Sequence, residues 1–242
     1  MRADGRKPDE LRIISITPDF VRYPEGSVLI ATGETRVLCN VSIEETIPNW
    51  MLTQGIPGGW ITSEYSMLPR STHSRTSRER SRLGGRTHEI QRLVGRSLRA
   101  AIDLEMIGPR TCIVDCDVLQ ADGGTRTAAI TGGYVALVIA LSDYIQSEKL
   151  NKQVIKTDVA AVSVGIVDGF PMLDLCYEED SAAEVDINVV MTSSGEFVEV
   201  QGTGENATFS RQDLDQMLNL AYKGIGELIK AQKQVLDSYF IP

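Results

Sequence analysis

A glycine turn in the middle of the chain carries residues suited to binding an anion. The stretch 121–127 reads ADGGTRT; it follows the apolar run 113–119 and precedes the small-residue run 128–141. We expect a strand, a tight turn and a helix start, where two glycines allow close backbone approach and free N–H groups favour an anion. Thr125 adds a hydroxyl and Arg126 a guanidinium that can bind phosphate through two hydrogen bonds. The turn lacks the lysine and spacing of a nucleotide triphosphatase loop, and an ordinary strand–helix turn would use the same residues.

A group of carboxylates is the second candidate for chemistry. Glu178, Glu179, Asp180, Glu184 and Asp186 lie close together in the sequence. Such carboxylates repel one another unless they are solvated, protonated or bridged by a cation. An all-oxygen set favours Mg²⁺ or Mn²⁺ over zinc, and a carboxylate there could also protonate a leaving alkoxide. A solvated acidic turn would account for the same residues.

An arginine-rich tract stands out from an otherwise acidic chain. The net charge is −9, yet residues 70–99 hold nine arginines and two glutamates, a charge of +7, which leaves −16 for the rest. A basic tract on an acidic body predicts contact with a polyanion, although a solvated loop or a subunit contact would also explain it. The arginines are Arg70, Arg75, Arg78, Arg80, Arg82, Arg86, Arg92, Arg96 and Arg99.

The tract divides into a mobile loop, 71–85, and a helix, 86–106. In the helix an apolar stripe packs on one side, while Arg92, Arg96 and Arg99 fall roughly opposite it. Arg86 stands at the helix start, where free N–H groups would also favour a bound phosphate.

Composition indicates an ordinary globular protein of 242 residues, long enough for one large or two small domains. No apolar run approaches the ~18–20 residues of a membrane span, and the polar start lacks the apolar core of a signal peptide. We therefore expect a cytoplasmic protein with no membrane partner. The four cysteines sit in apolar runs without a CxxC pair or a histidine cluster, which favours buried, reduced thiols over a metal site.

The periodicity predicts an α+β chain with two similar-sized lobes, an N-terminal lobe at about 10–146 and a C-terminal lobe at about 157–242. The polar connection 147–156 is the expected boundary. The expected strands are 11–16, 27–31, 35–43, 60–68, 111–120, 159–167, 172–176, 183–192 and 196–201, with a loop at 48–59. The first three should form an antiparallel meander, and 159–167 and 172–176 a hairpin across Asp168-Gly169. The alternation in 183–192 predicts that Glu184, Asp186 and Asn188 share one face of their strand. Besides 86–106, helices are expected from the glycine turn to about residue 145 and from Ser210, as N-cap, to about Tyr239.

Six long blocks of the chain share the pattern of a known family. They read RADGRKPDELR, ITSEYSMLPRSTHSR, GRTHEIQRLVGRSLRA, DCDVLQADGGTRTAAITG, LDLCYEEDSAAEVDINVVMT and EVQGTGENATFSR, and they span residues 2–211. In these blocks the chain resembles the ribonuclease PH family of phosphate-dependent 3′-to-5′ exoribonucleases. The stretch 78–84 departs from the pattern, because it is richer in arginine.

The resemblance implies a phosphorolytic reaction, in which inorganic phosphate is a co-substrate and a nucleoside diphosphate is released. It assigns phosphate binding to Arg86, Gly124, Thr125 and Arg126. It assigns Mg²⁺ (or Mn²⁺) binding and catalysis to Asp180 and Asp186, with Asp186 able to protonate the departing 3′ oxygen.

The resemblance also implies a substrate and an assembly. Such enzymes trim the 3′ extensions of tRNA precursors and run backward as polymerases when diphosphates are in excess. The expected fold is the ribonuclease PH fold over a single domain, 1–242, βαβ-rich with two similar halves, assembled as a homohexamer, a trimer of dimers. The tract would line the ring opening and grip the RNA backbone. Its RNA-binding residues would be Arg70, Arg75, Arg78, Arg80, Arg92, Arg96 and Arg99.

Three other functions compete with this hypothesis. A non-catalytic RNA-binding ring subunit would not need the phosphate and carboxylate residues together. A hydrolytic metal-dependent nuclease would not need a dedicated phosphate site. A small-molecule phosphate-binding protein would not need the +7 tract.

Overall fold

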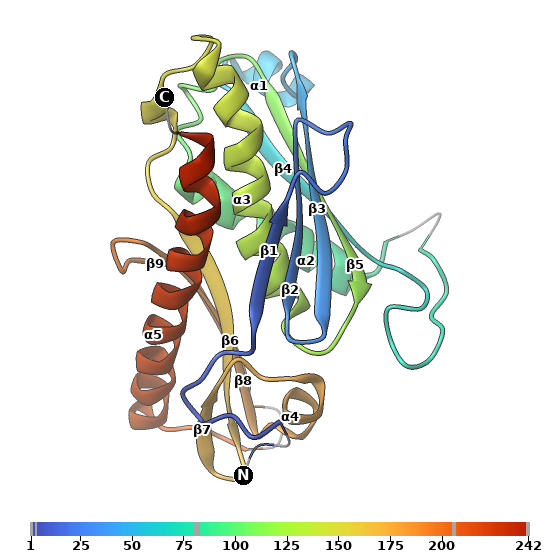
Figure 1. Cartoon of the computed structure of the whole chain (residues 1–242), viewed down its shortest axis with the longest axis vertical. Coiled ribbons are helices and arrows are strands. Elements are labelled where there is room, and N and C mark those ends of the chain that lie inside the picture. Colours follow the sequence, from blue (N-terminus) through green and yellow to red (C-terminus); the bar gives the residue numbers. More distant parts are fainter. Residues whose placement is uncertain (1, 3, 80–82, 205–206, 241–242) are drawn as a thin grey trace.

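The computed structural model describes residues 2, 4–79, 83–204 and 207–240, and their strands form two sheets (Figure 1). The elements of the first half are β1 (Ile14–Pro18), β2 (Gly26–Thr32), β3 (Thr35–Glu44), α1 (Asn49–Gln54), β4 (Trp60–Met67), α2 (Gly85–Ala101), β5 (Thr111–Gln120) and α3 (Thr125–Gln146). Those of the second half are β6 (Val159–Val167), β7 (Phe170–Leu173), α4 (Tyr177–Ala182), β8 (Val185–Thr192), β9 (Phe197–Gly204) and α5 (Arg211–Leu236), with short 3₁₀ turns at Lys152–Val154 and Asp237–Tyr239.

The first sheet has the strand order β1-β2-β3-β5-β4. β1, β2 and β3 form the expected antiparallel meander, and β3 continues antiparallel to β5. β4 and β5 are parallel, and α2 connects them, because a parallel pair needs a crossover that returns the chain to the same end. This βαβ unit places the start of α2 and the start of α3 at one end of the sheet.

The second sheet has the order β7-β6-β8-β9 and is antiparallel throughout. The turn between β6 and β7 has positive φ at both central residues, 52° at Asp168 and 76° at Gly169. Such a turn matches the twist of a two-residue hairpin, and the hairpin predicted across these residues is confirmed. α5 packs on β6, β7 and β8, and its Ser210–Asp213 capping box confirms the predicted start.

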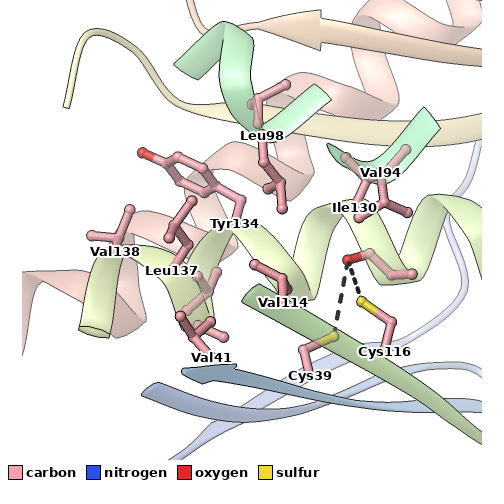
Figure 2. Close-up of a cluster of buried hydrophobic side chains, with 14 of the residues drawn as sticks. Cys39, Val41, Val94, Leu98, Val114, Cys116, Ile130, Tyr134, Leu137 and Val138 are labelled. Atoms are coloured by element: carbon pink, nitrogen blue, oxygen red, sulfur yellow. Dashed lines mark hydrogen bonds between the residues drawn. The ribbon is translucent and has the colours of Figure 1, made fainter. Parts of the chain in front are cut away.

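The long helix α3 packs against β2 and β3 of the first sheet and β6 of the second (Figure 1). It needs small residues, since a methyl group on Gly132 would lie 2.6 Å from Ile30 Cγ2. Figure 2 shows Cys39 and Cys116 of the first sheet directed at one carbonyl oxygen of α3, that of Ala129, at 3.9 and 3.8 Å. α3 is therefore the central helix of the core.

Burial on both sides explains the composition of α3. Its 22 residues are long and apolar enough to cross a membrane, a longer apolar run than we expected, but 83% of the most apolar window is buried. All four cysteines are free, as predicted, and burial raises the pKa of Cys112 to about 12. Cys176 differs from the other three in being only half-buried.

Several expected elements differ from the structure, among them the strand predicted at 172–176, which is β7 and ends at Leu173 because Cys176 caps α4. The loop predicted at 48–59 contains α1, which begins after Pro48, whose fixed φ suits a helix start. The helix predicted to reach residue 106 ends at Ala101, because Ile102 is extended and forms a bridge with Ile155. Residues 178–180, for which a solvated acidic turn was one alternative, belong to the short helix α4. β1 starts later than predicted because the backbone N–H of Arg12 donates to Asp174 instead of joining the sheet.

Candidate active site

The glycine turn has the backbone geometry that its sequence predicts. Gly123 and Gly124 have φ values of 73° and 65°, and Gly124 is the N-cap residue of α3. A methyl group on Gly123 would lie 2.5 Å from the carbonyl oxygen of Leu175 and 2.9 Å from the backbone nitrogen of Tyr177. Asp122 accepts a hydrogen bond from that same nitrogen at 3.2 Å. The turn therefore lies directly against the segment that leads into α4.

A buried phenol, that of Tyr65, lies among the expected phosphate-binding residues. The hydroxyl of Tyr65, on β4, lies 2.8 Å from the hydroxyl of Thr125. Burial raises the pKa of Tyr65, while the Thr125 hydrogen bond and the charges of Arg86 and Arg126 oppose that rise. The charges of Arg86, at the start of α2, and Arg126, at the start of α3, thus both act on this phenol.

Arg126 reaches from the start of α3 to the edge of the second sheet. Its guanidinium donates to Gln201 Oε1 at 3.1 Å and to Glu89 Oε1 at 3.4 Å, and Gln201 also donates to Glu89 at 2.6 Å. Gln201, on β9, lies opposite Asn188 of β8 in the sheet register. The arginine of the glycine turn thus contacts the strand beside the carboxylate-bearing β8.

The two candidate catalytic carboxylates lie on neighbouring elements. Asp180 is in α4 and Asp186 is in β8, where the predicted common face of 186 and 188 is confirmed by a 3.5 Å hydrogen bond from Asn188 Nδ2 to Asp186 Oδ2. Ser163 of β6 lies opposite Asn188, and a methyl group on Gly124 would be 3.9 Å from the Ser163 hydroxyl. The glycine turn therefore faces the part of the second sheet that carries Asp186.

The arginines of the tract have different environments. Arg70, Arg75 and Arg78 are exposed in the loop after β4, and Arg92 is exposed on α2, whereas Arg80 lies outside the described residues. Arg92 and Arg96 line a cavity of about 440 Å³ between α2 and β9, together with Gly85, His88, Glu89, Leu93, Glu199 and Gln201.

Two of the predicted RNA-binding arginines have partners within the protein. Arg96 pairs with Glu199 of β9 at 2.5 Å. Arg99 stacks over the Trp60 ring at 4.5 Å and donates to the carbonyl oxygen of Ile61 at 2.8 Å. The helical spacing that put Arg99 opposite the apolar stripe did not reveal this packing against β4.

Several residues of the site were not singled out from the sequence. Tyr65 and Gln201 sit in predicted strands, but nothing in their spacing pairs them with Thr125 and Arg126. Arg2 and Arg12 lie in the first sequence block, and in the structure they form buried ion pairs with Glu179 and Asp174. The only signal in the sequence was the density of arginine in that block.

The chain matches known proteins over nearly its whole length. Residues 10–142 match the 3′ exoribonuclease family, domain 1, and residues 158–224 match domain 2 of the same family. Ribonuclease PH of Bacillus subtilis (strain 168) is 57% identical, over 98% of this chain and 97% of the relative. Ribonuclease PH of Corynebacterium kroppenstedtii is 58% identical, over 98% and 93%.

Solved structures share the fold at low sequence identity. Rice (Oryza sativa) Rrp46 superposes with a TM-score of 0.77 at 20% identity, covering 97% of this chain and 100% of that one. A chain of the Archaeoglobus fulgidus exosome with RNA bound to the active site gives 0.76 at 22% identity, covering 95% and 91%. On the full-length matches to its curated relatives, this chain belongs to the ribonuclease PH family of 3′ exoribonucleases.

Proposed function

We propose that the protein is a phosphorolytic 3′-to-5′ exoribonuclease that trims the 3′ extensions of precursor tRNA and other RNA. One observation carries the proposal beyond family membership: Arg126, on the glycine turn, reaches Gln201 beside the strand that bears Asp186. This contact supports a single site in which an anion on α3 and a carboxylate on β8 face the same substrate.

The proposed reaction assigns each group a task. Gly124, Thr125, Arg126 and Arg86 hold inorganic phosphate, whose oxygen attacks the last phosphodiester phosphorus. The bond from that phosphorus to the 3′ oxygen of the preceding nucleotide breaks, and Asp186 supplies the proton that this oxygen takes. A nucleoside diphosphate leaves, and the reaction reverses when diphosphates are in excess. Alignment of the phosphate and neutralisation of its charge provide most of the acceleration.

The donor chemistry fits a bound Mg²⁺ (or Mn²⁺) at Asp180 and Asp186. Mg²⁺ sites in phosphoryl-transfer enzymes commonly use one or two carboxylates, with waters and substrate phosphates completing the shell. No group of three or more His, Cys, Asp or Glu residues suited to a metal occurs in the described parts of the chain, so waters and substrate phosphates would have to complete the shell of an ion held by Asp180 and Asp186. Such an ion supplies charge neutralisation at the reacting phosphate.

The exposed arginines of the tract support binding to the phosphate backbone of RNA. Arg70, Arg75, Arg78 and Arg92 are exposed, and we include Arg80, Arg96 and Arg99 in the proposed surface because they belong to the same tract. The assembly we propose is a homohexamer, a trimer of dimers, which would bring several tracts around one opening. The proposed compartment is the cytoplasm.

Product identity tests this function. A 3′-extended precursor tRNA is incubated with the protein and Mg²⁺, with and without inorganic phosphate, and the released nucleotides are separated. We expect nucleoside diphosphates only when phosphate is present. Monophosphates released without phosphate would make the protein a hydrolase, and RNA binding without release would make it a non-catalytic ring subunit.

A further inference from the structure

The N-terminal arm, residues 2–12 with residue 3 outside the described part, runs beside β7 and α4 (Figure 1). Arg2 is only 6% exposed there. Its Nε and Nη2 donate to the two carboxylate oxygens of Glu179 at 2.7 and 2.6 Å, the parallel fork geometry that makes arginine–carboxylate pairs strong. Glu179 is the residue before Asp180, so this ion pair acts on the helix that carries a candidate catalytic carboxylate.

The remaining donors of Arg2 hold the backbone in front of α4. Nη1 donates to the carbonyl oxygen of Leu173 at 2.8 Å, and Nη2 donates to that of Asp174 at 2.9 Å. α4 has six residues, and an isolated helix of that length is not stable in water. Its position therefore depends on tertiary contacts, of which the Arg2 pair is buried and geometrically specific.

A second arginine of the arm joins this segment to the glycine turn. Arg12 donates to both carboxylate oxygens of Asp174, at 2.6 Å from Nη2 and 3.1 Å from Nε, and its Nη1 donates to the carbonyl oxygen of Asp122. Asp174 is buried and has a φ of 54°, a left-handed conformation that few side chains adopt. One short arm thus contacts both α4 and the glycine turn, the two parts of the candidate site.

We propose that the N-terminal arm positions the two halves of the active site. Arg2 holds α4, and with it Asp180, in the catalytic orientation, while Arg12 holds the glycine turn against the segment before α4. Both are positioning residues that act through Glu179 and Asp174. The expected effect on phosphorolysis rests on the proposed function. The positioning of α4 and of the glycine turn rests on the ion pairs alone.

The test compares Arg2→Gln with Lys7→Gln, a matched control on the same arm whose side chain is 77% exposed. The first readout is backbone hydrogen exchange over residues 175–183. We expect the α4 amides of Arg2→Gln to exchange at least about tenfold faster, with the amides of α3 unchanged and the control identical to the wild type.

Two functional readouts accompany the exchange measurement. Mn²⁺ titrated into the free protein is followed by electron paramagnetic resonance, and phosphorolysis is measured against phosphate concentration. A displaced α4 would move Asp180, one of the two proposed metal ligands, and loss of a group that orients a ligand typically weakens a metal site about 10–100-fold. Since Arg2 acts through Glu179, we expect the low end of that range, a rise of about tenfold in the half-saturating Mn²⁺ concentration of Arg2→Gln, while the KM for phosphate stays within about twofold. Arg12→Gln should raise the KM for phosphate as well, because Arg12 also touches the glycine turn.

The outcomes separate this inference from the proposed function. Unchanged α4 exchange in Arg2→Gln would overturn it, and so would faster exchange with unaltered Mn²⁺ affinity and turnover, since the arm would then be merely structural. A wild type that releases no diphosphate would refute the proposed function, and the exchange data would still decide whether the arm holds α4. If Arg2→Gln does not fold, Glu179→Gln, which keeps one acceptor for Arg2, is measured in its place, with the same tenfold increase in exchange expected.

Discussion

Gly123→Ala should disturb the active site far more than a single methyl group usually does. Two costs apply at Gly123. Its φ of 73° is left-handed, which costs an alanine about 1–2 kcal/mol, and the new methyl carbon would lie 2.5 Å from the carbonyl oxygen of Leu175. The atoms it meets are backbone, which cannot turn aside as a side chain would. Overpacking of this kind adds about 1–3 kcal/mol, so we expect a total of about 3.5 kcal/mol.

Gly55→Ala is the matched control. Gly55 also has a left-handed φ, 63°, but nothing lies within 4 Å of its added methyl group. Only the backbone cost of about 1.5 kcal/mol then applies. At about 3 °C per kcal/mol for a chain of this size, the melting temperature should fall by about 5 °C in Gly55→Ala and about 10 °C in Gly123→Ala, measured by calorimetry.

The two variants should differ more in activity than in stability. Relief of the contact at Gly123 must move the glycine turn away from the segment before α4, which separates the proposed phosphate-binding and carboxylate residues. A displacement of about 1 Å can cost on the order of a hundredfold in rate, so we expect phosphorolysis at a temperature where both variants are folded to fall at least about tenfold in Gly123→Ala and to stay near normal in Gly55→Ala. Equal melting temperatures and equal rates for the two variants would refute the reasoning.

Three further outcomes are expected. Arg126→Lys should raise the KM for phosphate about tenfold while RNA affinity, measured by filter binding, stays within about twofold, because lysine lacks the planar fork; a large loss of RNA affinity would contradict the assignment. Arg92→Ala should lower the slope of log affinity against log salt by about 0.7, whereas Arg99→Ala, whose guanidinium is stacked on an indole ring, should lower that slope less and the melting temperature more; a wild-type slope in Arg92→Ala would contradict a phosphate contact by Arg92. Burial alone would raise the pKa of Glu179, but hydrogen bonds from Arg2 and the backbone outweigh it and lower the pKa below 4.5. This carboxylate therefore stabilises the fold above that pH and less as the pH falls through its folded pKa, so the urea midpoints of wild type and Glu179→Gln should converge in acid, and a constant difference would contradict the ion pair's role.

Local signals accounted for most of the fold. The two-residue turn at Asp168 and Gly169, the capping box at Ser210 and the alternation along β8 each depend on neighbours in sequence, and each was predicted correctly. α4 was missed because a six-residue acidic helix has too little apolar periodicity to distinguish it from a turn. The sequence predicted that Cys39 and Cys116 are buried, but it did not predict that both contact one carbonyl oxygen of α3.

In the candidate site, too, the local features could be predicted from the sequence and the contacts between distant residues could not. The conformation of the glycine turn follows from two adjacent glycines, whereas its partners come from distant strands and from the arm. Arg2 and Glu179 are separated by 177 positions, and Arg12 and Asp174 by 162, so no spacing rule could pair them. What pairs them is the antiparallel second sheet, whose β7 brings the chain back beside the arm just before α4 begins.

The position of α3 explains why these distant groups meet at its first turn. The helix packs on β2 and β3 with one side and on β6 with the other, so its N-terminus lies where the two sheets come together. From there Thr125 contacts β4 of the first sheet through Tyr65, and Arg126 contacts β9 of the second through Gln201. A change in how the sheets pack would therefore alter both contacts at once. The small residues that let α3 fit between the sheets, such as Gly132, act on the same geometry as the glycines of the turn, although they lie farther along the helix.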